Sequence, residues 1–130
     1  MDKQNGKKRY VKIRLRLSAE KLRAAKLLLQ NNELRDSVSR AYYCAFYAAK
    51  AFLLKHGEDP SSHHGVDVTF HHFCATHKKP SPELARLLSL MRQARLDADY
   101  KELAQITKED AQEAISMAQS FLKEIRSLLK

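Results

Sequence analysis

The stretch that decides the fold is SRAYYCAFYAAKAFLLKHG, residues 39–57, which is the most apolar part of the chain. From just before it, apolar residues recur at the spacing of a helix that buries one face: Val38, Tyr42, Ala45, Ala49 and Phe52, widened by Ala41, Phe46, Ala48 and Leu53. Asp36 or Ser37 is expected to cap this helix, and Gly57 to end it in the left-handed conformation. A helix this apolar must sit between other helices, or between a bundle and a second subunit.

Four further helices are predicted around it. The first runs from Ala19 to about Asn31 with Ser18 as its N-cap, and the third runs from near Ser62 to His77. Ser81 and Pro82 begin a fourth helix that ends near Tyr100 or Leu103, and residues 107–110 form a capping box for the last one. Helices joined by short loops predict an all-α fold, an antiparallel bundle of four to five helices.

Composition agrees with a single helical unit. The 130 residues include only three Gly and three Pro, which argues against an all-β fold with many turns. Only two cysteines occur, Cys44 and Cys74, the opening residues 1–10 lack the apolar core of a secretion signal, and no apolar run approaches the roughly 20 residues that span a bilayer. We therefore expect a cytoplasmic protein with reduced thiols and no membrane partner.

The basic charge is concentrated at one end. Residues 1–17 hold seven Lys and Arg against Asp2 alone, so +6 of the formal +9 lies there. We therefore divide the chain into a basic N-terminal arm (1–17) and a helical bundle (18–130). Lys8 and Arg9 of the arm could bind RNA phosphates through counterion release, but a basic arm also serves as a solubilising tail or docks on an acidic protein.

Residues 10–17 add an ambiguity, because apolar and basic residues alternate there. That period of two places Val11, Ile13, Leu15 and Leu17 on one face of an extended strand. A lone strand is not stable in a helical domain. It would lie along the bundle, pair with a copy of itself in a dimer, or join the first helix despite its pattern.

Three elements of the sequence resemble one known family. Residues 39–54, with Ser39-Arg40-Ala41-Tyr42-Tyr43 at their start, are similar to the central helix of HEPN domains (higher eukaryotes and prokaryotes nucleotide-binding). Residues 63–66 (HHGV) resemble the His-Ser-Gly-Val turn that follows it, and residues 95–100 (RLDADY) resemble the Arg-x-x-Ala-Asp-Tyr element of the fourth helix.

The resemblance implies a HEPN-like bundle that forms a homodimer, binds a nucleotide or RNA, and is the toxin-like partner of a minimal nucleotidyltransferase. It also implies a metal-independent endoribonuclease with an Arg-x4-6-His motif. Here the positions that follow Arg40 at that distance are Ala45, Phe46 and Tyr47. Moving the 2′-hydroxyl proton of RNA requires a group with a pKa of about 7, and the phenol of tyrosine has an unperturbed pKa of about 10. Ribonuclease activity is therefore in doubt.

The candidate site residues follow from the same elements. If RNA is cut, Arg40 holds the phosphate and Tyr47 or His64 assists. His63 or His64 could fold toward Arg40 in place of the missing base. The candidate nucleotide or RNA contacts, besides Lys8 and Arg9 of the arm, are Arg40, Tyr43, Arg95, Asp99 and Tyr100. A purely structural interpretation makes the tyrosines core aromatics and pairs Arg40 with Asp99, and places Arg92, Arg95 and Asp99 in surface ion pairs.

Two alternatives stay open. His64, Asp67, His71 and Cys74 share one face of the third predicted helix as possible zinc ligands, but they lack a dense local motif, and we expect no metal and no cofactor. The other alternative is a non-enzymatic dimeric interaction module, in which the tyrosine-rich face serves dimer or partner contact and a nucleotidyltransferase does the chemistry. A further option is that a tyrosine accepts adenylyl groups from that partner.

Overall fold

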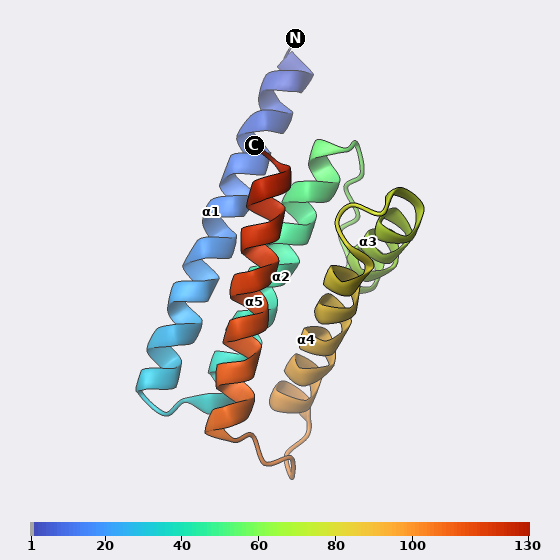
Figure 1. The fold of residues 1–130 in the computed structure, drawn as a ribbon. Helices are drawn as coiled ribbons and strands as arrows, with labels where there is room; N and C mark the ends of the chain where they lie inside the picture. The colour runs from blue at the N-terminus through green and yellow to red at the C-terminus, as the bar shows by residue number, and fades with distance from the viewer. Residues whose placement is uncertain (1) are drawn as a thin grey trace.

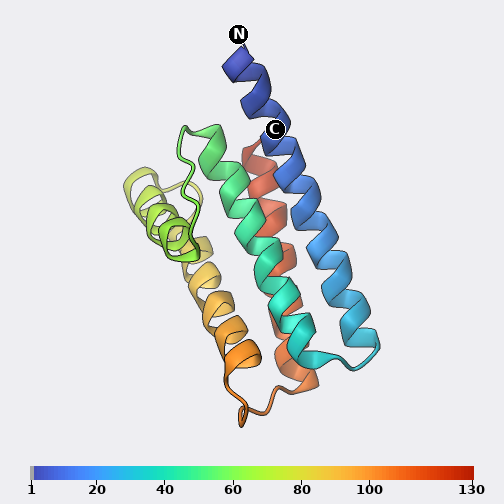
Figure 2. The same ribbon diagram turned by 180° about the vertical axis from the view of Figure 1, so that it is seen from behind.

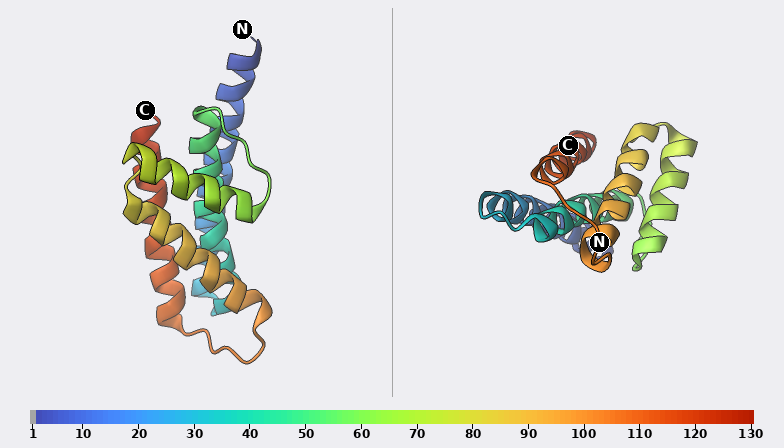
Figure 3. Two further views of the ribbon diagram at one scale, coloured as in Figure 1. Left: turned by 90° about the vertical axis from the view of Figure 1, so that its right-hand side faces the viewer. Right: turned by 90° about the horizontal axis from the view of Figure 1, so that it is seen from below.

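The computed structural model describes the backbone of residues 2–130 and the side chains from Gln4 onward. Its five helices are α1 (Asp2–Gln30), α2 (Leu34–Lys55), α3 (His63–His77), α4 (Pro82–Tyr100) and α5 (Lys108–Leu128). The long helices α1, α2, α4 and α5 run alternately down and up, and the short α3 lies across them (Figure 1 and Figure 3). The predicted all-α antiparallel bundle is confirmed.

Helix α2 is the centre of the bundle. It contacts each of the other four helices, and seen from behind it lies between α1 and α4 (Figure 2). Every residue of its predicted apolar stripe is buried, and five of its alanines are completely so: Ala41, Ala45, Ala48, Ala49 and Ala51. Small side chains let neighbouring helices approach α2 closely on several sides, so the apolar stretch at residues 39–57 organises the whole core.

The first helix corrects the prediction for residues 2–31. Helix α1 runs unbroken through residue 17, so the period-two segment joins the helix and forms no strand. Ser18 is not an N-cap: it is completely buried within α1, and its hydroxyl donates to the carbonyl oxygen of Cys44 at 2.6 Å. The same part of the sequence also contains a stripe at helical spacing: Val11, Leu15, Ser18, Leu22 and Ala25. This stripe packs on α2, and that packing outweighs the strand preference of the alternating residues.

The remaining helix ends agree with the prediction except at the start of α2. Ser81 and Thr107 are N-caps as expected, Thr107 and Asp110 form the capping box, and Gly57 has a φ of 86°. Ser62, expected only near the start of the third helix, is the N-cap of α3. Helix α2 begins at Leu34 with Glu33 as N-cap, which is earlier than either predicted cap. Ser37 is instead buried, and its hydroxyl donates to the carbonyl oxygen of Ala25 at 2.8 Å. The contact with α1 therefore extends α2 by a turn.

One arginine fastens the connection between α4 and α5 to the start of α2. The Arg35 guanidinium donates to the carbonyl oxygens of Ala98 (2.8 Å), Lys101 (3.0 Å) and Glu102 (3.2 Å), and also to that of Ala104. These carbonyls lie at or beyond the end of α4, where helical partners run out. Arg35 thus fixes the end of α4, which carries Asp99 and Tyr100.

Within residues 2–130, no helix combines the length and the apolar character that crossing a membrane requires.

Candidate functional site

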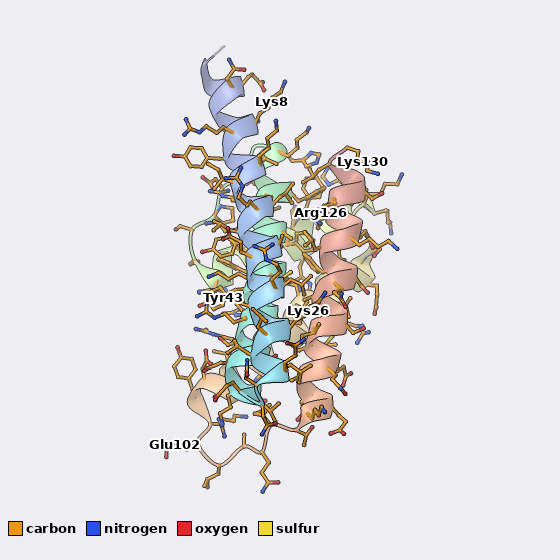
Figure 4. The ribbon with its side chains drawn as sticks, turned by 90° about the vertical axis from the view of Figure 1, so that its left-hand side faces the viewer. Lys8, Lys26, Tyr43, Glu102, Arg126 and Lys130 are labelled. Carbon is orange, nitrogen blue, oxygen red and sulfur yellow. The ribbon has the colours of Figure 1, made fainter. Side chains whose placement is uncertain are left out.

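A cleft of about 380 Å³ opens between α1, α2 and α4. Its lining residues are polar, charged or phenolic: Lys21 from α1, Asp36, Ser39, Arg40, Tyr43 and Tyr47 from α2, and Arg95 and Asp99 from α4. Figure 4 shows Tyr43 on the flank of the bundle where Glu102, just beyond α4, also lies. We call this the arginine cleft. It brings together five of the residues that the sequence selected: Arg40, Tyr43, Tyr47, Arg95 and Asp99.

Arg95 is held in place from several directions. Its Nε lies 2.9 Å from Asp99 Oδ2 in an ion pair one helical turn apart, and Nη2 donates to the Tyr43 hydroxyl at 3.2 Å. The guanidinium carbon lies 5.4 Å from the ring centroids of both Tyr43 and Tyr100, within cation–π range. The side chain is only 15% exposed. Arg95 is therefore a fixed positive charge in the wall of the cleft.

Arg40 contrasts with Arg95. Its side chain is exposed at the mouth of the cleft, and within the described part of the chain it makes no hydrogen bond or ion pair. The expected pairing of Arg40 with Asp99 is wrong, because Asp99 pairs with Arg95 and accepts from the Ser39 hydroxyl at 3.1 Å. With Lys21, the lining carries three cations against the two carboxylates of Asp36 and Asp99. An anion entering the cleft would thus find Arg40 with all its donors available.

The histidine that packs against α2 is His63, not His64. The His63 ring packs on Phe46 at 4.5 Å between centroids, and its Nδ1 lies 2.8 Å from the Tyr42 hydroxyl. Burial, and then the charges of Arg95, Arg92 and Lys50, lowers the pKa of His63. Burial raises the pKa of Tyr42 to about 12. The tautomer of His63 decides which of the two groups donates in this hydrogen bond.

Three other sequence candidates lie outside the cleft. His64 is exposed on α3, and Lys8 and Arg9 are exposed on the N-terminal half of α1. Figure 4 shows Lys8 near the projecting end of α1, well separated from Tyr43. Tyr100 is 67% exposed and borders the cleft through its contact with Arg95.

The face of α3 that offered zinc ligands is used for other contacts. The Nε2 atom of His71 lies 2.7 Å from Ser89 Oγ, and Asp67 lies 3.4 Å from Arg92, which removes Arg92 from the predicted cluster on α4. Cys74 is buried, and burial raises the pKa of its thiol to about 11. Among the side chains that the structure describes, no three metal-ligating groups gather at one point.

Three lining residues escaped the sequence analysis: Lys21, Asp36 and Ser39. Asp36 and Ser39 share the face of α2 that carries Arg40, Tyr43 and Tyr47, so helical spacing alone could have found them. Lys21 could not be found that way, because its position depends on how α1 packs along α2.

A model of the HEPN domain matches residues 11–128, which include every residue of the arginine cleft. The chain belongs to the HEPN domain family. The family match begins inside the basic arm, and helix α1 crosses the proposed division at residue 17, which stays a prediction.

Relatives of this HEPN chain cover most of its length. It is 34% identical over 126 residues to a UPF0332 protein of Thermotoga maritima, covering 97% of this chain and 96% of that one. It is also 34% identical over 116 residues to a protein of Methanocaldococcus jannaschii named "Putative toxin MJ0605", covering 89% of this chain and 86% of the relative. A UPF0332 protein of Pyrococcus horikoshii is 56% identical over 52 residues, which is 40% of this chain and 37% of the relative.

Proposed function

We propose that this chain is a toxin-like HEPN protein whose arginine cleft binds the phosphate of a nucleotide or of RNA. The observation that carries the proposal is the pair of arginines in the cleft: Arg95 is fixed by its neighbours, and Arg40 is exposed with no partner among the described side chains. The name of the Methanocaldococcus jannaschii relative supports the toxin-like role.

The groups in the cleft suit a phosphate with an attached base. The planar guanidinium of Arg40 offers paired N–H donors that match two phosphate oxygens. Lys21 adds a third cation to the lining, besides Arg40 and Arg95. Tyr47 is half-buried in the lining, and a phenol ring is a stacking partner for any base. Tyr43 has its ring next to Arg95, so its role is to hold that arginine.

The cleft supports binding better than cleavage. Proton transfer from a 2′-hydroxyl needs a group with a pKa of about 7, and the lining residues include no histidine in the part of the chain that the structure describes. Tyr47 stands where the Arg-x4-6-His motif would place one. Cleavage would therefore need a proton-transfer group from outside the lining of the cleft. The proposal also includes a homodimer and a minimal nucleotidyltransferase partner, as the family resemblance implies.

The second candidate is a non-enzymatic interaction module. It is favoured by the exposed residues beside the cleft, because Tyr100 is 67% exposed and Leu103 in the following loop is 97% exposed. Tyrosine is enriched in protein–protein interfaces. In this case the flank with Tyr100 and Leu103 would bind the nucleotidyltransferase.

Binding of a fluorescein-labelled single-stranded RNA at low salt, followed by fluorescence anisotropy, tests the proposal. Arg40→Ala should weaken binding by roughly tenfold or more, since a charged hydrogen-bonding group is lost. Arg86→Ala is the matched control, because Arg86 is an exposed arginine at the start of α4 that pairs with Glu83 and does not line the cleft. Equal losses of RNA affinity in the two variants would show that only general charge attraction holds the RNA. RNA bound by neither variant nor parent would reject the phosphate site and favour the interaction module.

A further inference from the structure

The N-terminal end of α1 projects past the ends of α2 and α5 (Figure 1). Where it passes them, a groove of about 470 Å³ lies between the three helices. Its apolar floor consists of Val11, Leu15 and Leu129, and four lysines line it as well: Lys7, Lys8, Lys12 and Lys55. We call it the lysine groove. It shares no residue with the arginine cleft.

Among the side chains that the structure describes, the four lysines have no acidic partner. None of them forms an ion pair with a side chain that the structure describes, and the nearby Asp59 is paired with Arg14 at 3.0 Å. Lys55 lies in the last turn of α2, where a cation is stabilised by the helix dipole. Lys7, Lys8 and Lys12 lie in the N-terminal part of α1, where the dipole gives no such stabilisation. The stability of the helix does not explain these three charges.

We propose that the lysine groove binds an acidic amphipathic segment of a partner protein. Its apolar side chains would lie on Val11, Leu15 and Leu129, and its carboxylates would pair with the lysines. The lining runs along α1 from Gln4 to Leu15, a length of about 16 Å at the helical rise of 1.5 Å per residue. A floor that long beside flanking charges suits a helix or an extended segment more than a compact ligand.

The same lining argues against nucleic acid as the occupant. Proteins that bind single strands combine cations with aromatic side chains on which bases stack, and arginine is the cation best matched to phosphate. The residues of the lysine groove include neither an aromatic side chain nor an arginine. The apolar floor and the lysine ammonium groups instead match a partner in which carboxylates flank aliphatic side chains.

The test uses the full chain and a designed probe. The probe is a fluorescein-labelled peptide that forms an amphipathic helix, with leucines on one face and glutamates along both sides. Anisotropy should show binding that falls with added salt, and Lys8→Glu/Lys12→Glu should weaken it by roughly tenfold or more. Arg23→Glu/Lys26→Glu is the matched control, because it reverses two exposed charges further along α1 and should leave the peptide affinity within about twofold.

A second peptide and a measurement of helix content complete the test. A peptide with serines in place of the leucines should bind markedly less, since the floor of the groove contributes only through apolar contact. Circular dichroism of each variant reports whether α1 remains helical. A peptide that does not bind the parent, or that binds both double variants equally, would overturn the proposal. So would a single-stranded RNA that loses affinity in Lys8→Glu/Lys12→Glu while the peptide does not.

Discussion

Two faces of the same helix, α2, serve different purposes. One face is small and apolar and packs into the core of the bundle, with Ala41, Ala45 and Phe52 among its residues. The other carries Arg40, Tyr43 and Tyr47 into the arginine cleft. Both faces come from one uninterrupted stretch of sequence, so the angular position of each residue around the helix axis decides whether it lies in the core or in the cleft.

Tyr42 and Tyr43 show the difference between neighbours. Tyr42 is 1% exposed, and its hydroxyl is bonded to His63. Tyr43 is half-buried, and its hydroxyl accepts from Arg95. The residue type is the same, yet one phenol belongs to the core and the other to the site. Chemistry on α2 is therefore available only where packing leaves a face open.

The largest expected effect tests this contrast by truncating one aromatic residue on each face. Phe52→Ala should lower the free energy of unfolding by about 3–5 kcal/mol, because Phe52 is 3% exposed and packs edge-on against Phe70 and Phe73. Tyr47→Ala should cost on the order of 1 kcal/mol, since its ring is half-buried in the cleft. Urea denaturation measures both. Equal losses would place the cleft face in the core and remove the contrast.

The second prediction concerns Arg35, which ties the cleft face to the end of α4. Arg35→Ala should lower the free energy of unfolding by about 1–3 kcal/mol, because the carbonyl oxygens of Ala98 and Ala104 lose their donor where they are partly buried. Arg35→Lys keeps the charge but cannot reach all four carbonyls, so its free energy of unfolding should lie between those of the parent and Arg35→Ala. Hydrogen exchange of residues 98–106 should speed up in Arg35→Ala; unchanged exchange would contradict the anchoring role.

The third prediction uses the buried phenol. Because burial raises the pKa of Tyr42 to about 12 in the folded chain, the unfolded chain releases that proton first as the pH rises. The contribution of Tyr42 is complete below about pH 10 and is lost between about pH 10 and pH 12, at up to about 1.4 kcal/mol per pH unit. The urea midpoint of the parent should therefore fall more steeply over this range than that of Tyr42→Phe. Parallel curves would show that the phenol is not held in the core.

The smallest expected effect concerns the charge balance of the cleft. Asp99→Asn removes the carboxylate beside Arg95 and should change the free energy of unfolding by less than about 1 kcal/mol, because the pair is partly exposed. Affinity for RNA should rise by a few-fold at low salt, on the order of 1 kcal/mol, and the gain should fade as salt is added. Asp97→Asn is the control, since Asp97 lies on α4 outside the cleft and pairs with Lys101. A gain in RNA affinity of the same size in both variants would indicate that only the net charge of the protein matters.

Much of the bundle could be predicted from local sequence signals. Thr107 accepts from a backbone N–H group of its own helix, Pro82 occupies the first position of α4, and Gly57 relieves strain at its own φ, so these signals do not depend on the rest of the fold. The predicted starts of the first helix at Ala19 and of α2 were wrong, and the choice between strand and helix for residues 10–17 stayed open, because packing between α1 and α2 decides them. Ser18 and Ser37 resemble caps in sequence, yet their hydroxyls bond across that contact.

The candidate site was predictable in part for the same reason. Arg40, Tyr43 and Tyr47 share a helix face, and Arg95 and Asp99 are one turn apart, so each set follows from helical spacing. Which carboxylate meets which arginine did not follow, because Asp99 pairs within its own helix and leaves Arg40 without a partner in the described chain. The choice between His63 and His64 was equally open, since it depends on the rotation of α3 against α2.

The sequence by itself determined the helical class, the central position of residues 39–57 and the two faces of that helix, because periodicity and capping are properties of a single segment. Only the tertiary structure decided that residues 2–17 extend a helix, that Arg95 is fixed while Arg40 is exposed, and that lysines of α1 and α2 meet around an apolar groove. Each of these depends on the register between helices. That register is set by how whole side chains pack against one another, and the spacing within one segment does not contain it.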